Sequence, residues 1–330
     1  MNNQDQLIQL LDVARRAISH YAIPAAVEIK MINLSENATF RLQAADGRIW
    51  ALRVHRQGYH THAAIASELA WSMALRREGV AVTPQPIAGI NGEIIQVVGE
   101  THSASARHVV LSVWEVGSEP KIDQELTKPF ETLGEVAARM HVHAKNWQPP
   151  AGFERFTWNF ETSLGEIAPH WGRWRDGIGV DAAKQVIFSR TVDLIGHRLK
   201  TYGKDPQRFG LVHGDLRLAN LLIDGDEVKV IDFDDCGFSW FMYDAATPVS
   251  FHEHTPQVPE LIEAWKTGYR RVAKLDRADE NEIPTFVMLR RLLLMAWIGT
   301  RRETALAQSM GVGYTDGTVG LCETYLRRFS

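Results

Sequence analysis

The most informative stretch of this chain is HGDLRLANLLIDGDEVKVIDFD, which covers residues 213–234. Asp215 follows a short apolar run, Asn220 comes five residues later, and Asp232 follows a second apolar run. Two short strands with a turn at residues 224–225 would bring these three side chains together. Carboxylate and amide oxygens are hard ligands that suit Mg²⁺, which takes only one or two protein carboxylates beside substrate phosphates. The stretch therefore indicates a centre for phosphoryl transfer.

Hydrophobic periodicity divides the chain near residue 117. Before that point, apolar residues alternate in several short runs, which is typical of strands, and Asp46-Gly47 is a hairpin turn signal. There we expect a helix over residues 5–20, three antiparallel strands within 26–55, a helix over 62–78, and strands within 86–98 and 109–116. Beyond it we expect helices over 124–143, 181–201, 258–273 and 283–307, with short strands at 209–213 and 227–231. The chain is therefore of the α+β class.

The overall composition is that of a globular protein, with 45% hydrophobic and 23% charged residues. The net charge of −4 offers no bulk attraction to nucleic acid or to an anionic membrane. Two cysteines cannot build a disulfide framework, and the first residues lack the pattern of a signal peptide, so we expect a cytoplasmic protein. The apolar run 286–298 contains Arg290 and Arg291, so we expect a buried helix with one polar edge rather than a membrane span.

The polar residues of the stretch 213–234 resemble a known catalytic motif. They follow the pattern His-x-Asp, four residues, Asn, then Asp-Phe-x, which is the catalytic loop and metal-binding motif of the protein-kinase-like superfamily. Gly214 in the second position is typical of the aminoglycoside phosphotransferase branch, which also holds choline kinases. The resemblance implies a two-lobed protein-kinase-like fold. Its small antiparallel β-sheet lobe with one main helix, residues 1–116, would bind nucleotide, and its larger, mostly helical lobe, residues 117–330, would carry catalysis and substrate binding.

The resemblance also implies ATP and Mg²⁺ as cofactors and a role for each motif residue. Asp215 matches the catalytic base, and Asn220 and Asp232 match the magnesium ligands. His213 matches a residue that braces the loop. Arg217 falls where protein kinases place a cation on the γ-phosphate.

Other positions match the nucleotide-binding residues of the family. Arg53 falls on the strand where the family usually places a lysine that holds the α- and β-phosphates, and Glu68 matches the acidic partner of that lysine. Arginine is a departure, although its planar group also grips phosphate through two hydrogen bonds. The remaining matches are Ser35 and Asn37 in the phosphate-covering loop, Trp114 and Val116 at the hinge, and Leu222 and Ile231 under the adenine.

Several side chains keep a second interpretation at this stage. Arg53 and Glu68 could be solvated surface charges, and Arg217 could be an exposed loop residue. Asp244 is open between capping the following helix and serving the active site. Other side chains that could serve substrate binding are Asp234 and Asp235, and the tryptophans Trp158, Trp171 and Trp174, which core packing explains as well.

The favoured function is transfer of the γ-phosphoryl group of ATP to a hydroxyl of a small molecule, with no nucleic-acid or membrane partner. A bacterial-type Ser/Thr protein kinase on the same fold is one alternative. Against it, Gly214 stands where an arginine would read an activation-loop phosphate, Asp234 replaces the glycine after Asp-Phe, and no Ala-Pro-Glu segment follows. A non-catalytic nucleotide-binding relative is another alternative; the three intact motif residues argue against it, and Arg53 argues for it. The acceptor and the oligomeric state stay open.

Overall fold

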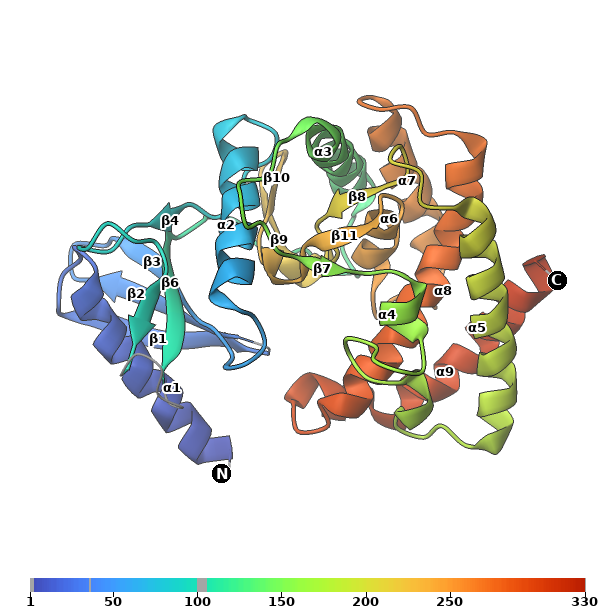
Figure 1. Cartoon of the computed structure of the whole chain (residues 1–330), viewed down its shortest axis with the longest axis horizontal. Coiled ribbons are helices and arrows are strands. Elements are labelled where there is room, and N and C mark those ends of the chain that lie inside the picture. Colours follow the sequence, from blue (N-terminus) through green and yellow to red (C-terminus); the bar gives the residue numbers. More distant parts are fainter. Residues whose placement is uncertain (1–2, 36, 100–105, 330) are drawn as a thin grey trace. The chain divides into compact units, whose positions relative to one another are not determined.

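The computed structural model describes residues 3–35, 37–99 and 106–329, and the chain forms two compact units (Figure 1). The first unit comprises Met1–Val116 and Gln148–Arg155, and the second comprises Gly117–Trp147 and Phe156–Ser330. The short segment Gln148–Arg155 is held in the first unit by hydrogen bonds. The backbone N–H of Glu154 donates to Ser67 Oγ at 2.8 Å, and Arg155 Nη1 donates to the carbonyl oxygen of Ala64 at 2.9 Å.

The first unit is built on an antiparallel sheet. Its strands are β1 (Val27–Leu34), β2 (Ala38–Ala44), β3 (Ile49–Val54), β4 (Pro86–Ile87), β5 (Gln96–Val98) and β6 (Arg107–Val113). They lie in the order β1-β2-β3-β6-β4, and β5 also pairs with β6. Every second side chain of β2 is buried, so the alternating sequence pattern places one face of the sheet in the core. The three expected antiparallel strands within residues 26–55 are confirmed, and Gly47 takes φ +88° in the expected turn.

Two helices complete the first unit. Helix α1 (Asn3–Ala17) contributes Leu10 and Ala14 to the same hydrophobic cluster as the strands. Helix α2 (His62–Arg77) begins after Thr61, whose side chain accepts a hydrogen bond from the backbone N–H of Ala64. It ends before Gly79, which takes the left-handed φ of +67° that glycine adopts without strain. Both helices confirm the sequence-based expectations.

The second unit is mainly helical, as expected. Its helices are α3 (Thr127–Asn146), α4 (Phe160–Leu164), α5 (Ala182–Tyr202), α6 (Tyr243–Ala246), α7 (Val258–Arg270), α8 (Arg277–Thr300) and α9 (Ala305–Phe329). Helix α9 was not expected, because its sequence is rich in glycine, which has low helix propensity. Gly311 has non-helical dihedral angles and kinks the helix. Packing against α5 and α8 therefore stabilises a helix that its own sequence does not favour.

The strands of the second unit correct one prediction. The expected strands at 209–213 and 227–231 exist as β8 (Phe209–Val212) and β10 (Glu227–Val230), but they are not partners. Strand β10 pairs with β9 (Leu221–Asp224), which lies between the two expected strands, where no strand was expected. Strand β8 pairs instead with β11 (Gly237–Trp240), which also pairs with β7 (Phe156–Thr157). The hairpin turn lies at Gly225-Asp226, one residue later than expected, and the strand that leads into it was missed.

Helix α8 is long and apolar enough to cross a membrane by length and composition, but 78% of its apolar window is buried within the protein, as in the core helix of a soluble fold. The expected polar edge on this helix is wrong. Arg290 and Arg291 are each only 2% exposed. A buried guanidinium requires partners, because removing a charge from water is costly. Both partners are carboxylates from elsewhere in the second unit, Asp215 and Glu253.

Candidate active site

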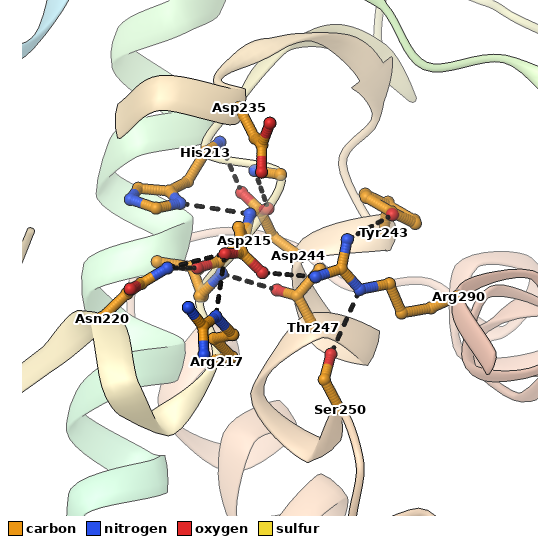
Figure 2. Close-up of polar contacts among 12 residues, drawn as sticks. His213, Asp215, Arg217, Asn220, Asp235, Tyr243, Asp244, Thr247, Ser250 and Arg290 are labelled. Carbon is orange, nitrogen blue, oxygen red and sulfur yellow. Dashed lines mark hydrogen bonds and ion pairs between the residues drawn. The ribbon is translucent and has the colours of Figure 1, made fainter. Parts of the chain in front are cut away.

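The loop between β8 and β9 is held by hydrogen bonds to the buried carboxylate of Asp244 (Figure 2). The backbone N–H groups of His213 and Gly214 donate to the Asp244 carboxylate at 3.0 and 2.8 Å, and Asp244 is fully buried. His141 Nε2 lies 3.1 Å from the same carboxylate. Asp244 lies inside α6 and does not cap that helix. It therefore anchors the loop through the main chain, which settles the interpretation that the sequence left open.

Gly214 is required by the geometry of this loop. Its φ of +80° lies in the region that side chains with a Cβ rarely adopt. A Cβ at this position would lie only 2.9 Å from the carbonyl oxygen of Asp235. The same carbonyl accepts a hydrogen bond from Trp158 Nε1 at 2.8 Å, so it is held in place. The loop therefore runs close against the segment that follows β10.

His213 joins the two halves of the 213–234 stretch. Its Nδ1 accepts from the backbone N–H of Asp215 at 3.2 Å, so its Nε2 carries the proton and donates to the carbonyl oxygen of Ile231 at 3.2 Å. The backbone N–H of Ile231 in turn donates to the carbonyl oxygen of Asn220 at 2.9 Å. Burial lowers the pKa of His213, which keeps the imidazole in this neutral form. These bonds bring Asp232, the next residue along the chain, beside the loop.

The Asp215 carboxylate is 7% exposed and is contacted on both oxygens. Its Oδ2 accepts from Asn220 Nδ2 at 2.7 Å and from Arg217 Nε at 3.1 Å. Its Oδ1 accepts from Arg290 Nη2 (Figure 2). Burial alone would raise the pKa of Asp215, but the charges of Arg290 and Arg217 outweigh it and hold the pKa below its usual range. Asp215 is therefore an ionised carboxylate that hydrogen bonds hold in one orientation.

Asn220 and Asp232 offer the donor set for a divalent metal. Asn220 turns its Nδ2 towards Asp215, which directs its amide oxygen the other way (Figure 2). Asp232 takes the left-handed φ of 63°, an uncommon conformation for a residue other than glycine. The charge of Asp232 acts on both Arg217 and His213, so its carboxylate lies near the loop.

These residues fit Mg²⁺ better than a metal that needs a complete protein cage. Within residues 3–35, 37–99 and 106–329, no group of three His, Cys, Asp or Glu side chains is placed to hold a metal. One amide oxygen and one carboxylate match the habit of Mg²⁺, which keeps several waters and binds substrate phosphates.

In the first unit, the side chains expected at the phosphates form an ion pair. Arg53 on β3 donates from Nη1 to Glu68 Oε1 on α2 at 2.7 Å. The side chains are 20% and 5% exposed, so neither is a solvated surface charge. Asn37 Oδ1 accepts from the backbone N–H of Arg56 at 3.0 Å, and the backbone N–H of Ser35 donates to the carbonyl oxygen of Asn37 at 3.1 Å. Glu36, between them, lies outside the described residues.

The other expected nucleotide residues lie on strands or follow them. Trp114 and Val116 follow β6, and the Arg41 guanidinium stands over the Trp114 ring at 5.7 Å from its centre. In the second unit, Leu222 lies on β9 opposite Lys229 of β10. Ile231 follows β10 directly and is only partly buried.

Sequence reasoning missed one cluster of residues around Asp215. Arg290 on α8 donates to Tyr243 Oη at 3.1 Å and to Ser250 Oγ at 3.2 Å, besides its ion pair with Asp215. The one available signal was a pair of arginines in an otherwise apolar helical run. The three tryptophans that core packing or substrate binding could explain, Trp158, Trp171 and Trp174, are all buried. The guanidinium carbon of Arg290 lies 5.1 Å from the centre of the Trp171 ring.

Comparison with known proteins identifies the family and the fold. The family model described as "Phosphotransferase enzyme family" matches residues 29–280. A solved structure of a microcompartment-associated aminopropanol kinase is 41% identical, with a TM-score of 0.88, and the match covers 96% of this chain and 98% of that one. The amicoumacin kinase of Bacillus subtilis (strain 168) is 25% identical over 81% of this chain and 78% of that protein. A structure of the amicoumacin kinase hAmiN shares the fold, with 19% identity, a TM-score of 0.75 and coverage of 97% and 96%. The motif, the fold and these matches together place the chain in the phosphotransferase enzyme family, as a kinase that phosphorylates hydroxyl groups.

Proposed function

We propose that this enzyme transfers the γ-phosphoryl group of ATP to the hydroxyl of a small amino alcohol, with Asp215 as the catalytic base. The observation that carries the proposal is the buried Asp215 carboxylate, held in one orientation by Asn220, Arg217 and Arg290. In the reaction, the acceptor oxygen forms a bond to the γ-phosphorus, the bond to the ADP oxygen breaks, and the hydroxyl proton passes to Asp215. An ionised carboxylate at a fixed position orients the hydroxyl for this attack.

Other residues of each unit would bind the nucleotide and its metal. Asn220 and Asp232 would hold Mg²⁺, which when bound offsets the negative charge of the ATP phosphates. Arg217, a cation beside Asp215, would contact the γ-phosphate. Arg53, oriented by Glu68, would hold the α- and β-phosphates in place of the usual lysine. Smaller contributions to nucleotide binding would come from Ser35, Asn37, Trp114, Val116, Leu222 and Ile231.

Each of the two units would have its own role in the reaction. Residues 1–116 would supply phosphate and adenine contacts, and residues 117–330 would supply the base, the metal ligands and the acceptor site. The amino alcohol is suggested by the 41% identity to an aminopropanol kinase along nearly the whole of both chains. Asp235 is the candidate for the acceptor's ammonium group, because its negative charge already acts on Arg290 and Tyr243 of this cluster.

The direct test is an ATP-consumption assay of the purified protein with a panel of acceptors. The panel contains aminopropanol, ethanolamine, choline, amicoumacin and a generic protein substrate. We expect the highest kcat/KM with aminopropanol and none with the protein substrate. Asp215→Asn should lower kcat by roughly 10² to 10⁴ while MgATP still binds. Comparable turnover by folded Asp215→Asn would refute the base, and a preference for another compound would refute the acceptor.

A further inference from the structure

Arg290 is buried in an apolar part of the protein, where removing its charge from water costs free energy. It is 2% exposed and lies in the middle of α8, a helix that is otherwise mainly apolar. Replacing a buried ion pair by apolar side chains of similar volume is often neutral or stabilising, so stability alone does not explain an arginine here. The contacts of the guanidinium indicate a role for it at Asp215.

The guanidinium of Arg290 is itself fixed on several sides (Figure 2). Nη1 donates to Tyr243 Oη at 3.1 Å, and Nε donates to Ser250 Oγ at 3.2 Å. The ring of Trp171 lies 5.1 Å from the guanidinium carbon, within the range of a cation–π contact. Only Nη2 is directed at Asp215, where it donates to Oδ1. Arg290 is therefore held as a rigid donor aimed at one carboxylate oxygen.

The contacts on Asp215 divide between its two oxygens. A carboxylate has about four acceptor positions, roughly two on each oxygen. Asn220 and Arg217 occupy two positions on Oδ2, and Arg290 occupies one on Oδ1. Among the contacts of the described residues, Oδ1 therefore keeps an acceptor position. Oδ1 is thus the oxygen best placed to receive the proton of the acceptor hydroxyl.

Arg217 and Asn220 orient the carboxylate from within its own loop. Both belong to the same loop as Asp215 and lie within five residues of it. Arg290 lies 75 residues further along the chain, on a different helix. It is the contact that ties the carboxylate to the helical core of the second unit.

We propose that Arg290 is a positioning residue that fixes the Asp215 carboxylate from α8 and so presents Oδ1 to the acceptor hydroxyl. The proposal rests on the proposed role of Asp215 as the base. It predicts that loss of Arg290 lowers kcat, because the proton acceptor is misplaced. It predicts no matching change in the KM for ATP, because Arg290 is not among the residues proposed to bind nucleotide.

Arg291 provides a matched control on the same helix. It is equally buried and also pairs with one carboxylate, Glu253 at 2.7 Å, but it contacts Thr318 and Tyr314 rather than the Asp215 cluster. Replacing Arg291 should therefore destabilise the fold about as much as replacing Arg290. In folded protein it should leave kcat unchanged.

The experiment measures kcat and KM with ATP and aminopropanol for Arg290→Lys, Arg290→Ala, Arg291→Lys and Arg291→Ala, at a temperature where thermal melts show each protein folded. A displacement of about 1 Å can cost 10²-fold in rate, so we expect Arg290→Ala to lose about 10²-fold in kcat and Arg290→Lys about 10-fold. The KM for ATP should stay within about twofold. Added guanidinium chloride at low millimolar concentration should restore kcat of Arg290→Ala about threefold or more, and should not affect Arg291→Ala.

Each result decides between the possibilities. A kcat within twofold of the parent enzyme in folded Arg290→Lys would overturn the proposal, and that variant decides the matter if Arg290→Ala does not fold. A defect confined to the KM for aminopropanol would also overturn it, since Arg290 would then be a substrate contact. Asp215→Asn is run in parallel. If that variant keeps its turnover, the base assignment fails; if it is inactive while Arg290→Lys is not, only the positioning role fails.

Discussion

Replacing Asp244 with asparagine should loosen the loop that carries Asp215, the proposed catalytic base. The two Asp244 oxygens take three donors: the backbone N–H groups of His213 and Gly214 and the ring N–H of His141. Asparagine offers one oxygen and one NH₂ group. If its oxygen keeps the two donors on Oδ2, its NH₂ faces the N–H of Gly214, which then loses its acceptor in a fully buried place.

The expected cost follows from this single lost contact. A hydrogen bond to a charged group contributes about 1.5–3 kcal/mol, and a buried donor without a partner is penalised further, so we expect a loss of about 3 kcal/mol. For a unit of this size, about 1 kcal/mol lowers Tm by roughly 2–4 °C, so Tm should fall by about 6–12 °C. Asp215 directly follows Gly214, so kcat should fall by about 10- to 10²-fold.

Thermal melts and steady-state kinetics with ATP and aminopropanol measure both effects. Asp279→Asn is the control, because Asp279 accepts from Tyr202 Oη at 2.6 Å and Arg208 Nε at 3.1 Å in the same unit, and neither partner belongs to the loop. The control should lower Tm without lowering kcat. Asp244→Asn with an unchanged Tm and a kcat within twofold of the parent would refute the reasoning that the Asp244 carboxylate holds the loop between β8 and β9 in place.

Three further changes test other parts of the molecule. Asp232→Ala should abolish Mg²⁺-dependent nucleotide binding, and a calorimetric titration that shows unchanged MgATP affinity would count against its role as a ligand. Glu253→Gln leaves the Arg291 guanidinium buried without a counter-charge, so chemical denaturation should show a free energy of unfolding lower by about 3–5 kcal/mol. The double variant Glu253→Gln with Arg291→Met should recover most of this loss. Arg53→Lys keeps the charge but loses the two-pronged donor, so the KM for ATP should rise about fivefold with little change in kcat; an unchanged KM would show that the two-pronged donor adds nothing that a lysine cannot supply.

Local patterns in the sequence were enough to predict most of the architecture. Alternation of apolar residues located β1 to β3 and the turn at Gly47, and helical spacing located α2, α3, α5 and α7. Apolar residues recur at regular spacing along each of these elements because each element buries one face, and the spacing is visible within a dozen residues. The motif within 213–234 was readable for a related reason, since its polar residues lie close together in sequence around a short hairpin.

Tertiary contacts decided the features that sequence reasoning missed. The short strand β9 and the glycine-rich helix α9 exist because other elements pack against them, which no local preference reveals. The sequence suggested that Arg290 formed a polar edge, and the fold buried it against Asp215, 75 residues away. Spacing in the sequence carries information about neighbours along one element. Whether a charge can be buried depends on a partner brought to it by the whole fold, and so the support of the Asp215 carboxylate could be seen only in three dimensions.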